Sequence, residues 1–178
     1  GPGESPTLFA RIARRYDLLN RVMSLGQDRR WRELAADVLV LPPQSRVLDV
    51  GIGTGDMALA VLRRWPDAMV VGADPTRAMM QIARRKLGTE SGSTQSPGST
   101  GRLRSSQARS SVGLAQADGL HLPFSDGCFD AAMSAFVLRN VVDVETALVE
   151  QHRVVRTGGR VVCLEMSWPR TPVFRALF

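Results

Sequence analysis

Short apolar runs of strand length alternate with amphipathic stretches of helical spacing along most of this chain. The apolar runs predict strands at 46–50, 68–73, 113–117, 129–134 and 160–166. The amphipathic stretches predict helices at 54–64, 76–87 and 143–156, after an N-terminal helical region at 7–38. Such alternation predicts an α/β fold, in which a mostly parallel sheet carries helices on both faces.

Three segments differ in composition along the 178 residues. Residues 1–42, which end at a Pro-Pro pair, form a predicted N-terminal helical cap, and 43–178 form the core of one domain. Within that core, 88–111 is rich in Gly, Ser, Thr and Arg and holds almost no large apolar residue. Because this composition buries too little surface to offset its ordering entropy, we expect a flexible insert there and assign it no function.

The segment 47–56 carries the strongest chemical signal. Apolar pairs around Asp49 predict a buried strand, and the glycines that follow at alternate positions predict a tight turn into a helix. The G-x-G-x-G spacing differs from that of dinucleotide sites, and the lysine of phosphate-binding loops is missing. Glycines and a helix N-terminus still favour a nucleotide-type cofactor, with candidate contacts from Asp49, Gly51, Gly53, Thr54 and Gly55. An ordinary strand-to-helix turn is the alternative.

Two further acids follow the next predicted strands. Asp74, directly before Pro75, is placed either to grip a ribose diol or to cap the helix that Pro75 begins, and both roles are compatible. Asp118, before Gly119, is placed either to accept from an adenine amino group or to hold an exposed turn. Asp49, Asp74 and Asp118 close three successive strands, and this placement is similar to the cofactor site of S-adenosylmethionine-dependent methyltransferases.

Composition and charge exclude several other classes. The net charge of +6 comes almost entirely from arginine, and no basic run is interleaved with aromatic residues, so we expect no nucleic-acid partner. Cys128 and Cys163 lack metal or disulfide spacing, and His121 and His152 offer no zinc constellation, so we expect no metal site. Because no secretory signal and no apolar run of membrane-spanning length is visible, we expect a cytoplasmic protein.

Three blocks of the sequence resemble the ubiquinone/menaquinone biosynthesis C-methyltransferase family, whose members methylate a ring carbon of polyprenylated quinols. The first block is Tyr-Asp-Leu-Leu-Asn at 16–20, with Ser24 and Trp31. The second is 122–130, which leads into Ala-Phe-Val-Leu-Arg-Asn-Val at 135–141. The third is 153–160, which runs on to Leu-Glu-Met-Ser at 164–167. Together these blocks span nearly the whole chain outside 88–111.

The resemblance implies a Rossmann-like class I S-adenosylmethionine-dependent methyltransferase that ends before the family's C-terminal strands. It implies S-adenosyl-L-methionine as the cofactor, with contacts at Thr54, Asp74, Asp118 and Gly119. The same resemblance places Arg139 and Asn140 at the catalytic end of the fourth strand, and Tyr16 in a region that helps to cover the substrate. The chain departs from the family at Asp28, where His is usual, and at Val137, where Gly commonly follows the Phe.

Methyl transfer to a ring carbon requires the quinol hydroxyl to lose its proton as the carbon attacks. A guanidinium is a poor base, but in a dry site its fixed charge stabilises a phenolate. We therefore expect Arg139 to stabilise the phenolate, Asn140 to orient it, a water to remove the proton, and Tyr16 to add a hydrogen bond. A surface salt bridge between Arg139 and Asp143 is the alternative.

The implied substrate is a lipid-soluble quinol, most directly demethylmenaquinol converted to menaquinol. The basic, amphipathic N-terminal region either docks peripherally on the inner face of the membrane or packs over the active site. A homo-oligomer would cover the sheet edge that the missing strands leave open. Two other functions stay open: methylation of a different small molecule, and a non-catalytic partner subunit that binds S-adenosylmethionine. The choice between benzoquinol and naphthoquinol and the prenyl length also stay open.

Overall fold

The structure of the chain is a computed structural model that describes residues 24, 26–88 and 112–166. Most of the predicted N-terminal helical region, Tyr16 and nearly all of the predicted insert at 88–111 lie outside the described residues. The helices of the described part are α2 (Asp28–Val38), α3 (Asp56–Arg64), α4 (Arg77–Lys86), the 3-10 helix η1 (Leu138–Asn140) and α5 (Val144–Val154). The strands are β1 (Arg46–Val50), β2 (Met69–Asp74), β3 (Val112–Gln116), β4 (Phe129–Ala135) and β5 (Val155–Leu164).

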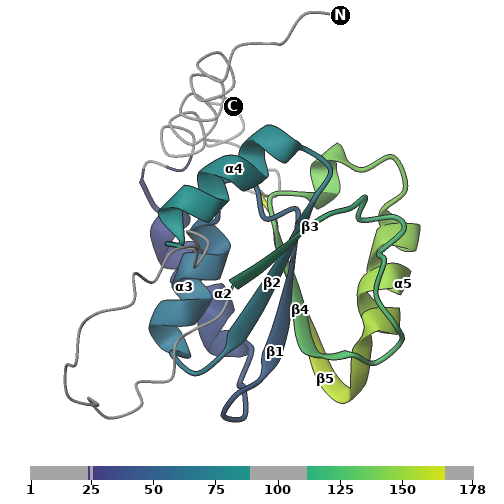
Figure 1. The fold of residues 1–178 in the computed structure, drawn as a ribbon, viewed down its shortest axis with the longest axis horizontal. Helices are drawn as coiled ribbons and strands as arrows, with labels where there is room; N and C mark the ends of the chain where they lie inside the picture. The colour runs from purple at the N-terminus through teal and green to yellow at the C-terminus, as the bar shows by residue number, and fades with distance from the viewer. Residues whose placement is uncertain (1–23, 25, 89–111, 167–178) are drawn as a thin grey trace, which may run out of the picture.

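The five strands form one parallel sheet in the order β3-β2-β1-β4-β5. Helices α2, α3 and α4 lie on one side of the sheet and α5 lies on the other (Figure 1). The predicted α/β class, the parallel sheet and the helices on both faces are therefore confirmed. Since all five strands run in parallel, their carboxyl ends meet at one edge, where ligands of open α/β sheets bind.

The start of β5 is the main difference from the predicted elements. The sequence predicts a helix to 156 and a strand from 160, whereas α5 ends at Val154 and β5 begins at once. Phe129 pairs with Val155 and Ala131 with Arg160, so an irregular stretch of β5 is accommodated between two neighbouring pairs. Gly159 permits this close approach, because a Cβ there would lie 2.5 Å from the Asp130 carbonyl oxygen.

Two apolar cores lie on opposite faces of the sheet. Val47 packs into the cluster beneath α2 and α3, whereas Leu48 and Val50 pack into the cluster that includes Val154 of α5. Side chains alternate across a strand, so the position of Val47 sends Asp49 to the same face, toward α2 and α3. The burial pattern of β1 thus carries a carboxylate into the interior near the carboxyl end of the sheet.

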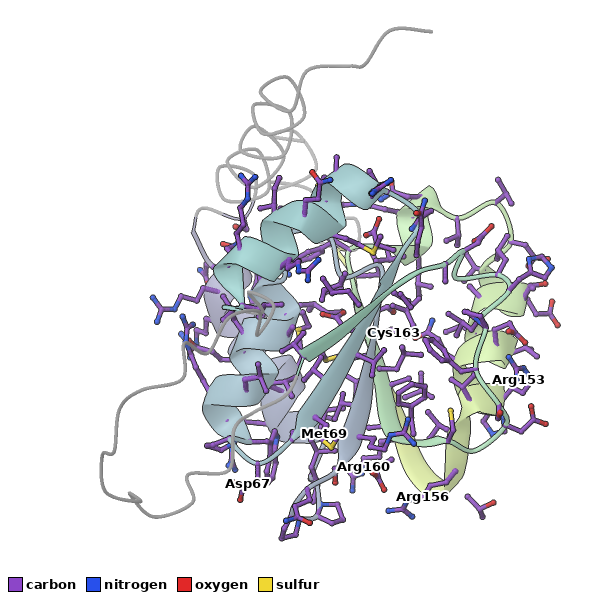
Figure 2. The ribbon with its side chains drawn as sticks, in the orientation of Figure 1. Asp67, Met69, Arg153, Arg156, Arg160 and Cys163 are labelled. Carbon is purple, nitrogen blue, oxygen red and sulfur yellow. The ribbon has the colours of Figure 1, made fainter. Side chains whose placement is uncertain are left out.

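Arg153 of α5 binds the segment between β3 and β4 to this helix (Figure 2). Its guanidinium donates to the carbonyl oxygens of Phe124 at 2.8 Å and Leu122 at 3.0 Å. It also pairs with the carboxylates of Glu150 and Asp126. The hydrogen bond from Arg153 lowers the pKa of Glu150 to about 2, so this carboxylate stays ionised across the ordinary pH range.

Replacing Arg153 with methionine should lower the melting temperature at pH 7 by several degrees, because two carbonyl groups and Glu150 lose their donor. The folded-state pKa of Glu150 is depressed, so its contribution to stability is present above pH 4.5 and is lost as the pH falls toward 2. The difference between the two proteins should therefore narrow below pH 4.5 in calorimetric scans. Arg85→Met, at an exposed position of α4, is the matched control. An unchanged melting temperature in Arg153→Met would contradict this role.

Candidate cofactor and substrate site

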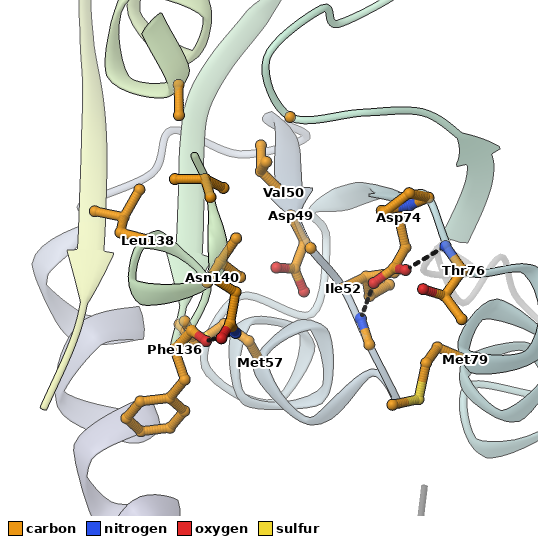
Figure 3. A pocket seen from close by; sticks show the side chains of 18 of the residues that line it. Asp49, Val50, Ile52, Met57, Asp74, Thr76, Met79, Phe136, Leu138 and Asn140 are labelled. Carbon is orange, nitrogen blue, oxygen red and sulfur yellow. Dashed lines mark hydrogen bonds between the residues drawn. The ribbon is translucent and has the colours of Figure 1, made fainter. Parts of the chain in front are cut away.

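A cavity of about 420 Å³ opens at the carboxyl ends of β1, β2 and β4. Its wall brings together most of the site residues that the sequence predicts: Asp49, Gly51, Gly53, Thr54, Asp74, Pro75, Asp118, Gly119 and Asn140. Figure 3 shows Asp49 between Asn140 on one side and Asp74 on the other. A cavity of this size suits a nucleoside-type ligand, and its position is the one expected for an open parallel sheet.

The glycines of the loop after β1 serve different purposes. Gly51 adopts a left-handed φ of +69°, and a Cβ there would lie 2.4 Å from Cγ2 of Val137, so only glycine fits. Gly55 is also left-handed, but its Cα faces α4, where a Cβ would lie 3.1 Å from Leu87. Among the described residues, Gly55 is not part of the cavity wall. It allows α3 to begin close against α4.

Asp74 connects the glycine loop to the start of the next helix. Its Oδ2 accepts from the backbone N–H of Gly53 at 2.9 Å, and its Oδ1 accepts from that of Thr76 at 2.7 Å (Figure 3). The predicted helix cap is not formed, because α4 begins at Arg77 after the N-cap residue Thr76 and no side chain caps it; Asp74 instead fixes the turn that leads into α4. The carboxylate is buried yet lines the cavity, which leaves the predicted contact with a ribose compatible with this geometry.

Asp49 is a buried carboxylate that the surrounding protein compensates only in part. It is 1% exposed, and both carboxylate oxygens lack a hydrogen-bond partner among the described residues. Burial raises the pKa of Asp49 to about 7, even though the positive charge of Arg32 and the nearby backbone N–H of Ala58 oppose that shift. A carboxylate held in this way needs a donor, and the cavity is the place from which a cationic ligand group would supply one.

Arg32 of α2 is a cavity residue that the sequence analysis does not predict. Its side chain is only 11% exposed, and its buried Nε donates no hydrogen bond within the described part of the chain. Arg32 forms an ion pair with Asp28, whose Oδ2 lies 3.9 Å from this Nε, beyond hydrogen-bonding distance. The guanidinium lies 4.9 Å from the centroid of the Phe136 ring, a cation–π distance.

The 3-10 helix at 138–140 directs the side chains of Arg139 and Asn140, both predicted to be catalytic, to different places. Asn140 lines the cavity and donates from Nδ2 to the Phe136 carbonyl oxygen at 3.3 Å. Arg139 is exposed and is not among the described residues of the cavity wall; its guanidinium lies 5.5 Å from the Phe136 ring centroid. Asp143, its alternative partner, caps α5 by accepting from the backbone N–H of Thr146 at 3.0 Å.

The remaining parts of the wall come from the segment after β3 and from α5. Asp118 lines the cavity and accepts from the backbone N–H of Leu120 at 3.0 Å, so it holds a turn while facing the cavity. Gln151 of α5 is fully buried in the wall, and its Oε1 lacks a donor among the described residues.

The structure also accommodates the two residues that depart from the family pattern. Val137 packs beside Gly51, and the buried carboxylate of Asp28 accepts from the Ser24 hydroxyl at 3.3 Å.

Metal binding and membrane spanning find no support in the described ranges. There, no group of three or more His, Cys, Asp or Glu side chains is arranged to hold a metal ion. Within the same part of the chain, no helix combines the length and apolar character needed to cross a bilayer.

Comparisons with known proteins agree with this geometry. The sequence matches the ubiE/COQ5 methyltransferase family over residues 4–178. It is 42% identical to the ubiquinone/menaquinone biosynthesis C-methyltransferase UbiE of a Geobacter species and 43% identical to the demethylmenaquinone methyltransferase of Thermus thermophilus. Each match covers 96% of this chain, which spans 66% of the first relative and 70% of the second.

The fold also matches solved structures. One is the geranyl diphosphate C-methyltransferase of Streptomyces coelicolor, at a TM-score of 0.58 and 20% identity. That match covers 74% of this chain and 41% of the other, and it shows a shared fold. With the family match along nearly the whole sequence and the cavity at the expected edge of a class I methyltransferase sheet, the chain belongs to the ubiE/COQ5 methyltransferase family.

Proposed function

We propose that this protein transfers a methyl group from S-adenosyl-L-methionine to a ring carbon of a polyprenylated quinol, converting demethylmenaquinol to menaquinol. Family membership supports the reaction class, and the name of the Thermus thermophilus relative supports the naphthoquinol substrate. The observation that carries the proposal is the orphaned carboxylate of Asp49 in a cavity at the carboxyl ends of the strands.

The residues of the cavity fit this cofactor. Its amino-acid end carries an ammonium group, which would give the buried oxygens of Asp49 the donors that they lack. Asp74, at the tip of the neighbouring strand, would accept from the ribose hydroxyls, and Asp118 lies one strand further along for the adenine. When bound, the cofactor supplies an electrophilic methyl group on a sulfonium.

The residues after β4 would act on the quinol. Asn140 faces the cavity, and we assign it the orientation of the quinol oxygen. The guanidinium of Arg139 lies beside it, against Phe136, and a turn of this side chain about its flexible stem would bring its charge to the developing phenolate. A nearby fixed charge lowers the pKa of the hydroxyl, whose proton then leaves through water. Tyr16, outside the described residues, is assigned the additional hydrogen bond.

The rim of the cavity suits a lipid-soluble substrate. Val142 lines the cavity and is 94% exposed, and the neighbouring Val141 and Leu138 extend the apolar wall. An apolar rim would let the prenyl chain leave toward a membrane. The proposal also includes a cytoplasmic location, peripheral contact with the inner face of the membrane and a homo-oligomeric state.

A methyl-transfer assay tests the proposal. The chain is incubated with deuteromethyl S-adenosylmethionine and demethylmenaquinol of short prenyl length, and the product is analysed by mass spectrometry. The expected product carries one deuteromethyl group on the naphthoquinol ring. A parallel reaction with the demethyl benzoquinol should give less product. Binding of S-adenosylhomocysteine without methylation of either quinol would favour a non-catalytic partner subunit and contradict the proposed activity.

Replacing Arg139 with alanine should leave the affinity for S-adenosylhomocysteine within about twofold of the original and lower turnover by roughly 100-fold or more. The reason is that Arg139 does not line the cavity but directly precedes Asn140, the residue assigned to the quinol oxygen. Arg77→Ala, on the exposed start of α4, is the control for loss of a surface charge. Unchanged turnover in Arg139→Ala would remove Arg139 from the mechanism.

A further inference from the structure

We propose that Arg32 is the residue that binds the carboxylate of the cofactor's amino-acid end, and so selects S-adenosylmethionine over cofactor analogues without that carboxylate. This inference rests on the proposed function, since it concerns the same cavity. It assigns Arg32 to the cofactor rather than to the fold or to the quinol.

The position of Arg32 on α2 is the first observation. Asp28, Ala35 and Ala36 are the buried residues of α2, and Arg32 lies on the same stripe, one turn after Asp28. An inward stripe of a helix normally carries apolar side chains, because a buried charge without full hydrogen bonding is costly. Among the described residues this guanidinium has the ion pair with Asp28 but no hydrogen-bond acceptor for its Nε, which indicates a role beyond packing.

The relation to Asp49 is the second observation. Both side chains line the same cavity from the same face of the sheet, and Arg32 supplies the largest of the effects that oppose the influence of burial on the pKa of Asp49. Neither group donates to or accepts from the other within the described residues. The cavity wall therefore holds a positive and a negative group, each with unused hydrogen-bonding capacity.

A zwitterionic amino-acid group matches this pair. Its ammonium would donate to Asp49, and its carboxylate would accept from the planar guanidinium of Arg32, a charge-assisted hydrogen bond with defined geometry. A phenolate alone would satisfy Arg32 and leave Asp49 without a donor. The Phe136 ring, whose centroid lies 4.9 Å from the guanidinium, adds a cation–π contact on the same side chain.

The test compares S-adenosylmethionine with decarboxylated S-adenosylmethionine, which retains the amine and lacks only the carboxylate. By titration calorimetry, the original protein should bind S-adenosylmethionine about 10- to 100-fold more tightly than the decarboxylated compound. Arg32→Gln should lose most of that preference by weakening only S-adenosylmethionine binding, and Arg32→Lys should recover part of it. Arg29→Gln, at an exposed position of the same helix, should keep the full preference.

Each of the other possible results would refute either the role of Arg32 or the proposed function. Equal preference in Arg32→Gln and the original protein would refute the role of Arg32 and leave the proposed function standing. An equal loss of affinity for both compounds in both Arg32 variants would indicate a merely structural residue, and so would also refute it. If the original protein does not discriminate between the compounds, the inference fails without any variant. If the original protein binds neither compound, the proposed function itself fails.

Discussion

Replacing Asp49 with asparagine is expected to stabilise the ligand-free protein at pH 8 while removing most of its affinity for S-adenosylhomocysteine. The folded-state pKa of Asp49 is about 7, well above its ordinary value of 3.8. Between these two values the folded protein binds more protons than the unfolded chain, so stability falls as the pH rises. By pH 8 the cost of the buried carboxylate is on the order of 4 kcal/mol, and asparagine avoids most of it.

Urea unfolding of the ligand-free proteins at pH 5 and pH 8 checks the first half of this prediction. Asp49→Asn should gain stability relative to the original protein at pH 8 and gain much less at pH 5. Asp67→Asn, at an exposed turn, should show no such pH dependence. A destabilised Asp49→Asn at pH 8 would show that the carboxylate already has a partner in the ligand-free protein.

The affinity of Asp49→Asn for S-adenosylhomocysteine checks the second half. Loss of the charged acceptor for a buried ammonium should weaken binding by roughly 100-fold. Binding by the original protein should also tighten from pH 6 to pH 8, because the carboxylate has to be ionised when the ammonium enters. Calorimetry in two buffers of different ionisation enthalpy would reveal the released proton. Equal affinity at both pH values would contradict an ammonium at Asp49.

Asp74→Ala is expected to have a comparable effect on binding through different contacts. It removes the acceptor for the N–H groups of Gly53 and Thr76, so the glycine loop and the start of α4 lose their shared anchor. It also removes the group proposed to hold the ribose. Loss of two or more charge-assisted hydrogen bonds predicts an affinity for S-adenosylhomocysteine lower by about 100- to 1,000-fold.

The measurement for Asp74 is again a calorimetric titration, here with adenosine as a second ligand. Because the ribose belongs to adenosine too, Asp74→Ala should weaken both ligands, whereas Asp49→Asn should weaken S-adenosylhomocysteine alone. Asp37→Ala, in an exposed ion pair on α2, is the control. Retained adenosine binding in Asp74→Ala would place the ribose elsewhere in the cavity.

The sheet and much of the cavity wall were predictable because local signals and topology agree. The predicted strand at 46–50 is β1 to the residue, and the parallel arrangement brings the carboxyl ends of β1, β2 and β3 to one edge. The acids at 49, 74 and 118 meet in the cavity for that reason. Topology thus converts three separate sequence positions into one site.

Arg32 and Gln151 show what the sequence does not reveal. Arg32 lies on the inward stripe of α2 with Asp28, Ala35 and Ala36, and Gln151 is buried in α5 with Ala147 and Val154, whereas polar residues on helices are ordinarily exposed. A periodicity analysis that asks which polar residues fall on the inward stripe would have found both. Their unused hydrogen-bonding atoms become visible only when the packing around them is known.

The orientation of Arg139 was also beyond sequence reasoning. The Arg-Asn pair predicts two catalytic neighbours, but residues 138–140 form a short 3-10 helix, anchored by the Leu138 N–H to Glu165 at 2.8 Å. Successive side chains of such a turn point in different directions, so Asn140 faces the cavity and Arg139 does not line it. The assigned role of Arg139 therefore requires a side-chain movement when the quinol binds.

Amide chemical-shift mapping of the isotopically labelled protein during titration with S-adenosylhomocysteine tests most directly where the cofactor sits. The predicted shifts are concentrated at the amides of Gly51, Gly53, Thr76 and Gly119, which surround the cavity. The amides of Met69 and Arg160, near the opposite end of the sheet, should stay unchanged (Figure 2). Shifts confined to that opposite end, or no shifts at a saturating concentration of ligand, would contradict the site described for this protein.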